Sequence, residues 1–184
     1  MVIRELQRTL LTQDAQLPVA VLKDVKITMH GGPGELVLKK GAKLELPLSD
    51  ALPLLKKGFI ALDSERLHSP QEVNKVRWLE SRDAGSIQAL NGDFYLKARL
   101  SIIDMEQRGV DERKVSLVKA TLVDIIRLRL QKIMKAVSAS PEPSRDLLEK
   151  LTWEERMLYT TLCGFVREWY RSMVEFIEKG DVIG

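Results

Sequence analysis

The spacing of apolar and polar residues divides the chain into regions of different structure. Residues 18–62 alternate apolar and polar positions over short runs separated by Gly and Pro, which is typical of strands joined by tight turns. Residues 93–179 repeat apolar positions every three or four residues over long runs, which predicts helices. Residues 2–11 predict a further short helix. The pattern therefore predicts an α+β protein, in which a small N-terminal β-rich domain is followed by an all-α helical bundle domain.

The β-rich region is expected to hold several short strands and one helix. Residues 18–29 are rich in Val and Ile and predict one or two strands, and the Gly-rich residues 30–34 predict a turn. Ser49 is positioned to cap a short helix that Gly58 ends, with Pro53 near its first turn. The remaining strands are predicted by three short runs, at residues 35–40, 43–48 and 59–63.

The helical region is expected to contain three helices, at residues 93–108, 110–137 and 151–179. The last of these opens with Thr152 and Glu155, which have the spacing of a capping box. Residues 63–92 are polar and predict a connector that contains one helix. The expected domains are residues 1–62, residues 63–92 as the connector, and residues 93–184.

Composition and charge narrow the class of protein. Of the 184 residues, 45% are apolar and 30% are charged, which is typical of a folded globular chain. The net charge of +3 is spread evenly over both halves, so it permits contact with nucleic acid without arguing for it. Cys163 is the single cysteine, so no internal disulfide can form and a reducing, intracellular compartment is expected. No apolar run approaches the roughly 18 residues that a membrane span needs.

The sequence contains no recognisable catalytic motif. Its Gly-rich turn lacks the Lys-Ser or Lys-Thr of a phosphate-binding loop. Cys163 lies among apolar residues and is expected to be a buried structural thiol, and His30 and His68 are expected to be exposed loop residues. Two histidines and one cysteine far apart do not resemble a metal site. We therefore expect no enzymatic activity, no cofactor and no metal.

A basic run in the second long helix is a candidate contact surface. No acidic residue lies between Asp124 and Glu142. The positive charges suit either a solvated helix end or contact with a partner or DNA, and both alternatives stay open. The candidate residues are Arg127, Arg129, Lys132 and Lys135.

The two longest helices carry more apolar surface than one core face needs. The predicted core face of the helix at 113–137 contains Val115, Leu122, Ile126, Leu130, Ile133 and Val137. The predicted core face of the last helix contains Leu158, Leu162, Phe165, Trp169 and Phe176. A second apolar row on each helix requires another covering, and a neighbouring subunit is one candidate. The first helix or the connector is the other. The expected subunit contacts are Leu117, Ile125, Leu128, Tyr159, Tyr170 and Val174.

Two parts of the sequence carry a resemblance to a known family. The first is GELVLKKGAKLELPLSDALPLLKKGFIAL (34–62), where a Gly-containing turn leads to an apolar-Glu-apolar-Pro-Leu run and a short helix. The second consists of the helical stretches VDIIRLRLQKIMKAV (123–137) and LTWEERMLYTTLCGFVREWYRSM (151–173). They resemble, respectively, the β domain and two long helices of the α domain in subunits of the GINS complex, a DNA replication factor of archaea and eukaryotes. The domain order resembles the archaeal β-first subunit type, whereas the Arg-x-Arg-x-x-Lys run at 127–132 is closer to the α-first type.

The resemblance implies a scaffold without enzymatic activity or cofactor. By this resemblance the chain is expected to form a tetramer with other GINS subunits, of one or two types. It is expected to link the MCM helicase to a RecJ-like or Cdc45-type protein, to stimulate unwinding, and to contact primase or polymerase. Weak contact with DNA at most, no membrane and a nucleoid-associated, cytoplasmic location are expected.

An independent basic nucleic-acid-binding protein is the alternative. Such a protein would bind DNA tightly and with a steep salt dependence, because each neutralised phosphate releases counterions. The even distribution of charge favours the scaffold.

Overall fold

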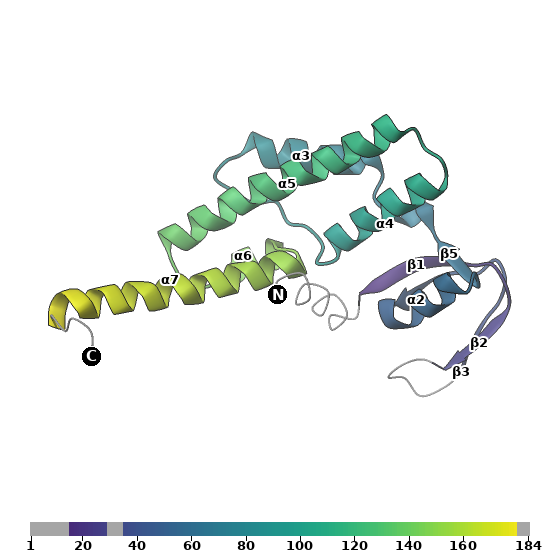
Figure 1. The fold of residues 1–184 in the computed structure, drawn as a ribbon, viewed down its shortest axis with the longest axis horizontal. Coiled ribbons are helices and arrows are strands. Elements are labelled where there is room, and N and C mark those ends of the chain that lie inside the picture. The colour runs from purple at the N-terminus through teal and green to yellow at the C-terminus, as the bar shows by residue number, and fades with distance from the viewer. Residues whose placement is uncertain (1–14, 29–34, 180–184) are drawn as a thin grey trace. The chain divides into compact units, whose positions relative to one another are not determined.

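The computed structural model describes residues 15–28 and 35–179 of the chain (Figure 1). The helix predicted at residues 2–11, His30 and the Gly-rich turn at residues 30–34 lie outside the described residues. In the described part, short strands and one helix come first and longer helices follow. The predicted α+β class, with a small N-terminal β-rich region before a helical region, is confirmed.

A three-stranded antiparallel sheet is built around β1 (Gln16–Val21). This strand pairs with β4 (Lys43–Pro47) on one side and β5 (Ile60–Leu62) on the other. A separate antiparallel pair joins β2 (Val25–Thr28) to β3 (Glu35–Leu38). Because side chains alternate along a strand, residues 17, 19 and 21 of β1 all point into the core and are at most 2% exposed.

The helix α2 (Leu48–Lys56) covers this core, and its start differs from the sequence prediction. Ser49 was expected to cap it, but the N-cap is Pro47 and no side chain caps the first turn. Pro53 lies inside the helix rather than near its first turn. Gly58 does end it, with a φ of 68° that suits glycine, and its N–H donates to the Leu55 carbonyl.

Further helices complete the chain (Figure 1). A short 3₁₀ segment, η1 (Ser64–Arg66), and α3 (Pro70–Arg82) lie within the predicted connector. The next two helices agree with the prediction to within two residues at each end: α4 (Phe94–Gln107) and α5 (Glu112–Ala139). The sequence pattern did not predict α6 (Arg145–Lys150), which precedes the long α7 (Trp153–Lys179).

The chain divides into two compact units. Unit 1 falls within residues 1–73 and 93–119, and unit 2 within residues 74–92 and 120–184. In unit 1, Leu96 and Leu100 of α4 pack against the apolar core of the strands and α2. The predicted domain boundaries differ from this division and stay a prediction.

The core of unit 2 is assembled from α5, α6, α7 and the segment that follows α3. Its buried apolar residues are Ile87, Ile133, Val137, Leu151, Tyr159 and Cys163. Polar groups share this interior, and they determine which faces of the long helices point inward.

Candidate interaction surfaces

Arg129 of α5 lies at the centre of a buried ionic network in unit 2. Its side chain is 0% exposed, although arginine is almost never fully buried unless it is paired. The guanidinium group donates through Nε and Nη2 to the two carboxylate oxygens of Glu155, both at 2.7 Å. Its Nη1 donates to Glu80 and to the Gln88 carbonyl, and its Nη2 donates to the Lys150 carbonyl. All five N–H groups of the side chain are therefore satisfied.

Glu80 of α3 is the second centre of this network. It is 0% exposed, and its carboxylate accepts hydrogen bonds from Arg129, Lys132 and the Gln88 N–H. The Lys132 Nζ also donates to the Glu80 carbonyl at 2.8 Å. These bonds connect α3, α5 and the segment after α3. A buried charge needs such complete pairing, because desolvation of an unpaired ion costs several kcal/mol.

Glu155 connects the network to the start of α7. Its Oε2 accepts a hydrogen bond from the Thr152 N–H at 3.0 Å, and the Thr152 Oγ1 accepts one from the Glu155 N–H at 3.4 Å. The predicted capping box is therefore confirmed. The same carboxylate caps a helix and neutralises Arg129.

The candidate basic residues separate into two kinds. Arg129 is buried in ion pairs with Glu80 and Glu155, so the prediction that it contacts a partner or DNA is wrong. Lys132 is paired with Glu80 but is only partly buried, and its contact stays a prediction. Arg127 and Lys135 are exposed. The sequence pattern could not distinguish the buried Arg129 from the exposed Arg127, because the carboxylates that bind Arg129 are 49 and 26 residues away.

The predicted core face of α5 is partly wrong. Val115, Leu122, Ile133 and Val137 are buried as expected, but Ile126 is 48% and Leu130 41% exposed. The inward face is rotated towards Ile125 and Arg129, which are both 0% exposed. The outer row contains Val123, Ile126, Leu130 and Met134, each at least 41% exposed.

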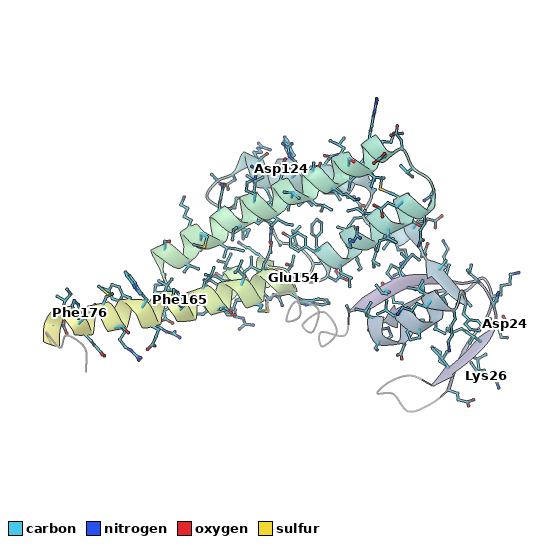
Figure 2. The ribbon with its side chains drawn as sticks, viewed as in Figure 1. Asp24, Lys26, Asp124, Glu154, Phe165 and Phe176 are labelled. Carbon is cyan, nitrogen blue, oxygen red and sulfur yellow. The ribbon has the colours of Figure 1, made fainter. Side chains whose placement is uncertain are left out.

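The predicted core face of α7 is mostly exposed. Phe165 is 69%, Trp169 57% and Phe176 46% exposed, and Leu158 is 36% exposed. Leu162 is half-buried and packs against the core. Figure 2 shows the labelled Phe165 and Phe176 along α7. The outer row of α7 contains Phe165, Trp169, Met173, Phe176 and Ile177.

The residues predicted to form subunit contacts have different environments. Ile125 is 0% and Tyr159 2% exposed within the single chain, so their assignment to a subunit contact is wrong. The Tyr159 hydroxyl accepts from the Ser144 N–H and donates to the Glu142 carbonyl, which ties it to the loop before α6. Leu117 is 62% and Tyr170 64% exposed. Leu128 and Val174 are half-buried.

Of the candidate reactive residues, Cys163 is confirmed as buried and is 0% exposed. Burial raises the pKa of its thiol above the ordinary value and so disfavours the nucleophilic thiolate. His68 is half-buried rather than exposed, with its ring 4.9 Å from that of Phe94. Burial lowers the pKa of His68.

The described residues hold neither a metal-binding cluster nor a membrane-spanning helix. No group of three His, Cys, Asp or Glu side chains among them is arranged to hold a metal ion. None of the helices within residues 15–28 and 35–179 is both long and apolar enough to cross a membrane.

The fold and its surfaces define a class of protein: a small β-rich region joined to a helical bundle whose long helices present apolar rows to the outside. Residues 66–174, more than half of the chain, match the family model Sld5, the GINS complex protein helical bundle domain. The chain therefore belongs to the GINS family of replication proteins. No curated protein matches the chain.

Proposed function

We propose that this chain is a non-enzymatic scaffold subunit of a GINS complex, of the archaeal β-first type. In this proposal it assembles with other GINS subunits into a tetramer and links the MCM helicase to a RecJ-like or Cdc45-type protein. It thereby raises the rate of DNA unwinding at the replication fork, with primase or polymerase as further partners. Family membership supports assembly with other GINS subunits, and the finer roles follow from the resemblance.

The outer rows of α5 and α7 are the observation that carries this proposal. Large apolar side chains stay exposed on two long helices of unit 2, and contiguous exposed apolar surface of this kind marks interaction sites. Trp and Phe, which are enriched at subunit contacts, dominate the row on α7. The proposed subunit contact consists of these rows together with Tyr170 and Val174. Leu117, which belongs to unit 1, and Leu128 stay predicted contacts outside these rows.

The test compares assembled mass before and after a charge is placed in the row. Trp169→Glu would bury an unpaired carboxylate in the contact, at a cost of several kcal/mol. We expect this variant to keep its helical circular dichroism and to run as a smaller species in light scattering with its neighbour subunit. Thr160→Glu is the matched control, because Thr160 is exposed on the opposite side of α7.

If Trp169→Glu kept the parent's assembled mass, the outer row of α7 would not be the subunit contact. Unwinding by the cognate helicase, measured with and without the RecJ-like partner, tests the accessory role. An unchanged rate on addition of the complex would contradict that role.

A further inference from the structure

A groove between α3 and α5 lies apart from the apolar rows. Two adjoining hollows of about 260 and 250 Å³ share Ser81, Leu128 and Gln131 as lining. Arg77, Asp124 and Arg127 surround one end, and Lys132 and Lys135 surround the other. On the α5 helical wheel, the lining residues that belong to α5 are at least about 20° from the nearest member of the outer row of α5. Most of them are about 60° or more away from it. We refer to this feature as the α3–α5 groove.

The charge of the groove is unbalanced. Four cations and two carboxylates line it, which leaves an excess of two positive charges. The Glu80 carboxylate is already engaged by Arg129 and Lys132 in the buried network. The exposed charges of the groove are therefore Arg77, Arg127 and Lys135 against Asp124.

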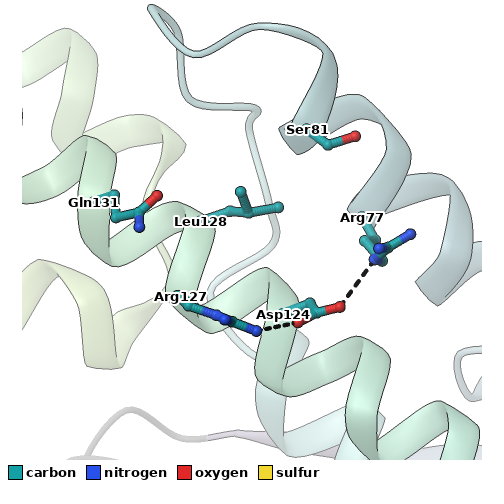
Figure 3. A pocket seen from close by; sticks show the side chains of 6 residues that line it. All are labelled: Arg77, Ser81, Asp124, Arg127, Leu128 and Gln131. Atoms are coloured by element: carbon teal, nitrogen blue, oxygen red, sulfur yellow. Dashed lines mark hydrogen bonds and ion pairs between the residues drawn. The ribbon is translucent and has the colours of Figure 1, made fainter.

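Asp124 occupies the space between two guanidinium groups, as Figure 3 shows. Its carboxylate accepts from the Arg77 Nε at 3.2 Å and from Nη2 of Arg127. Arg77 is 50% and Arg127 65% exposed, and their other N–H groups have no acceptor among the described residues. The Asp124 carboxylate therefore occupies only some of the N–H donors of Arg77 and Arg127, and the others are available to a ligand.

Leu128 gives the groove an apolar surface. It is half-buried and contributes to both hollows, one of which Figure 3 shows. Along α5 the groove extends from Asp124 to Lys135, about 16 Å at the rise of an α-helix. That length accommodates about five residues of an extended chain.

We propose that the α3–α5 groove binds a short acidic peptide segment of a protein partner, one that carries an apolar side chain between its carboxylates. The carboxylates match the excess of two positive charges, and the apolar side chain covers Leu128. Single-stranded nucleic acid fits less well, because no aromatic side chain lines the groove to stack on a base. The exposed Trp78 on α3 lies outside the lining and is approached by Arg82 instead.

The test measures binding of a fluorescein-labelled peptide of about eight residues, in which Asp and Glu alternate with Leu, to the assembled protein. Two further peptides test the two parts of the proposal. One has Asn and Gln in place of the acids and tests the role of the carboxylates. The other has Ser in place of Leu and tests the role of the apolar side chain. We expect fluorescence anisotropy to give a Kd at least about tenfold higher for each of them. An oligothymidylate of equal charge is expected to bind more weakly than the acidic peptide.

Variants of the chain then locate the binding site. Arg127→Gln with Lys135→Gln is expected to raise the Kd about tenfold. Arg171→Gln is the matched control, because Arg171 is 64% exposed and pairs three residues back with Glu168, as Arg127 pairs with Asp124. Asp124→Asn is expected to tighten binding several-fold, because it removes the internal carboxylate that competes for both guanidinium groups.

Equal affinity for the neutral peptide, tighter binding of the oligothymidylate, or no effect of the Arg127 and Lys135 changes would overturn the proposal. The peptide assay measures affinity and not assembled mass, so this proposal and the proposed subunit contact can fail separately. Trp169→Glu tests the subunit contact by mass, and the groove variants are expected to leave that mass unchanged.

Discussion

The interiors of the two units are built from different chemistry. Unit 1 is held by an apolar cluster in which residues 17, 19 and 21 of β1 pack beneath α2. Unit 2 has a smaller apolar cluster and places Arg129, Glu80 and Glu155 beside it, each at most 7% exposed. An apolar core tolerates small shifts of packing, whereas a bidentate ion pair requires one geometry. The comparison indicates that hydrogen-bond geometry orients the helices of unit 2.

The largest expected effect tests whether the ionic interior stabilises unit 2. Arg129→Met removes the cation from two buried carboxylates, Glu80 and Glu155, and breaks five hydrogen bonds. Breaking a buried pair by removing one partner costs about 3–5 kcal/mol. Urea unfolding should show a loss of stability of that size.

Arg127→Met provides the control for Arg129→Met. Arg127 is 65% exposed and pairs only with Asp124 among the described residues, so its loss should cost at most about 1 kcal/mol. If the two variants lost similar stability, the buried network would not be what distinguishes unit 2.

The next prediction concerns the segment that the ionic network holds against α7. The Gly92 carbonyl accepts from the Trp153 N–H at 3.1 Å, and a Cβ added at Gly92 would lie 2.3 Å from the Trp153 Nε1. Gly92→Ala is therefore expected to destabilise unit 2 by about 1–3 kcal/mol, as overpacking does. Thermal unfolding followed by circular dichroism measures it.

Gly164→Ala is the matched control for Gly92→Ala. Gly164 lies in α7 with no atom within 4 Å of an added Cβ, so alanine should stabilise the helix by about 0.5–1 kcal/mol. If Gly92→Ala lost no more stability than Gly164→Ala, the backbone at Gly92 would not approach Trp153 as the structure describes.

The smallest expected effect concerns His68 of unit 1. Burial lowers its pKa, so as the pH falls through about 6.5 the unfolded chain takes up a proton that the folded chain resists. The free energy of unfolding should therefore rise from about pH 5.5 to about pH 7.5, and His68→Leu should reduce that rise. Urea titrations at both pH values measure the difference.

His30 is present in both proteins of this comparison, so its own titration cancels. An equal pH dependence in the wild type and His68→Leu would show that the burial of His68 has no effect on its protonation.

The sequence predicted the elements well because their signals are local. Alternation in β1 and β4, and spacing by three and four in α4, α5 and α7, depend only on neighbouring residues. The capping box at Thr152 was found for the same reason, since both partners lie within one turn. The Ser49 cap failed because α2 begins at Leu48 with Pro47 as its N-cap, which places Ser49 inside the first turn.

The inward faces of the helices were predicted less well, and Arg129 explains the error in α5. Apolar spacing treats an arginine as a surface residue, which rotates the predicted core face towards Ile126 and Leu130. The structure rotates it back, because Glu80 and Glu155 make Arg129 a core residue. Glu80 and Glu155 are 49 and 26 residues from Arg129, so a local sequence pattern cannot reveal the ion pairs.

The sequence by itself determined the α+β class, the order of the elements apart from α6, and the excess of apolar surface on two long helices. Only the tertiary structure decided which of those apolar rows is internal. Tyr159 and Cys163 are covered by their own chain, whereas Phe165 and Trp169 on the same helix are not. The physical reason is that hydrophobicity measures the gain from leaving water but does not specify the covering surface. In α7 the covering of the first half comes from distant segments of the chain, and the second half extends beyond them.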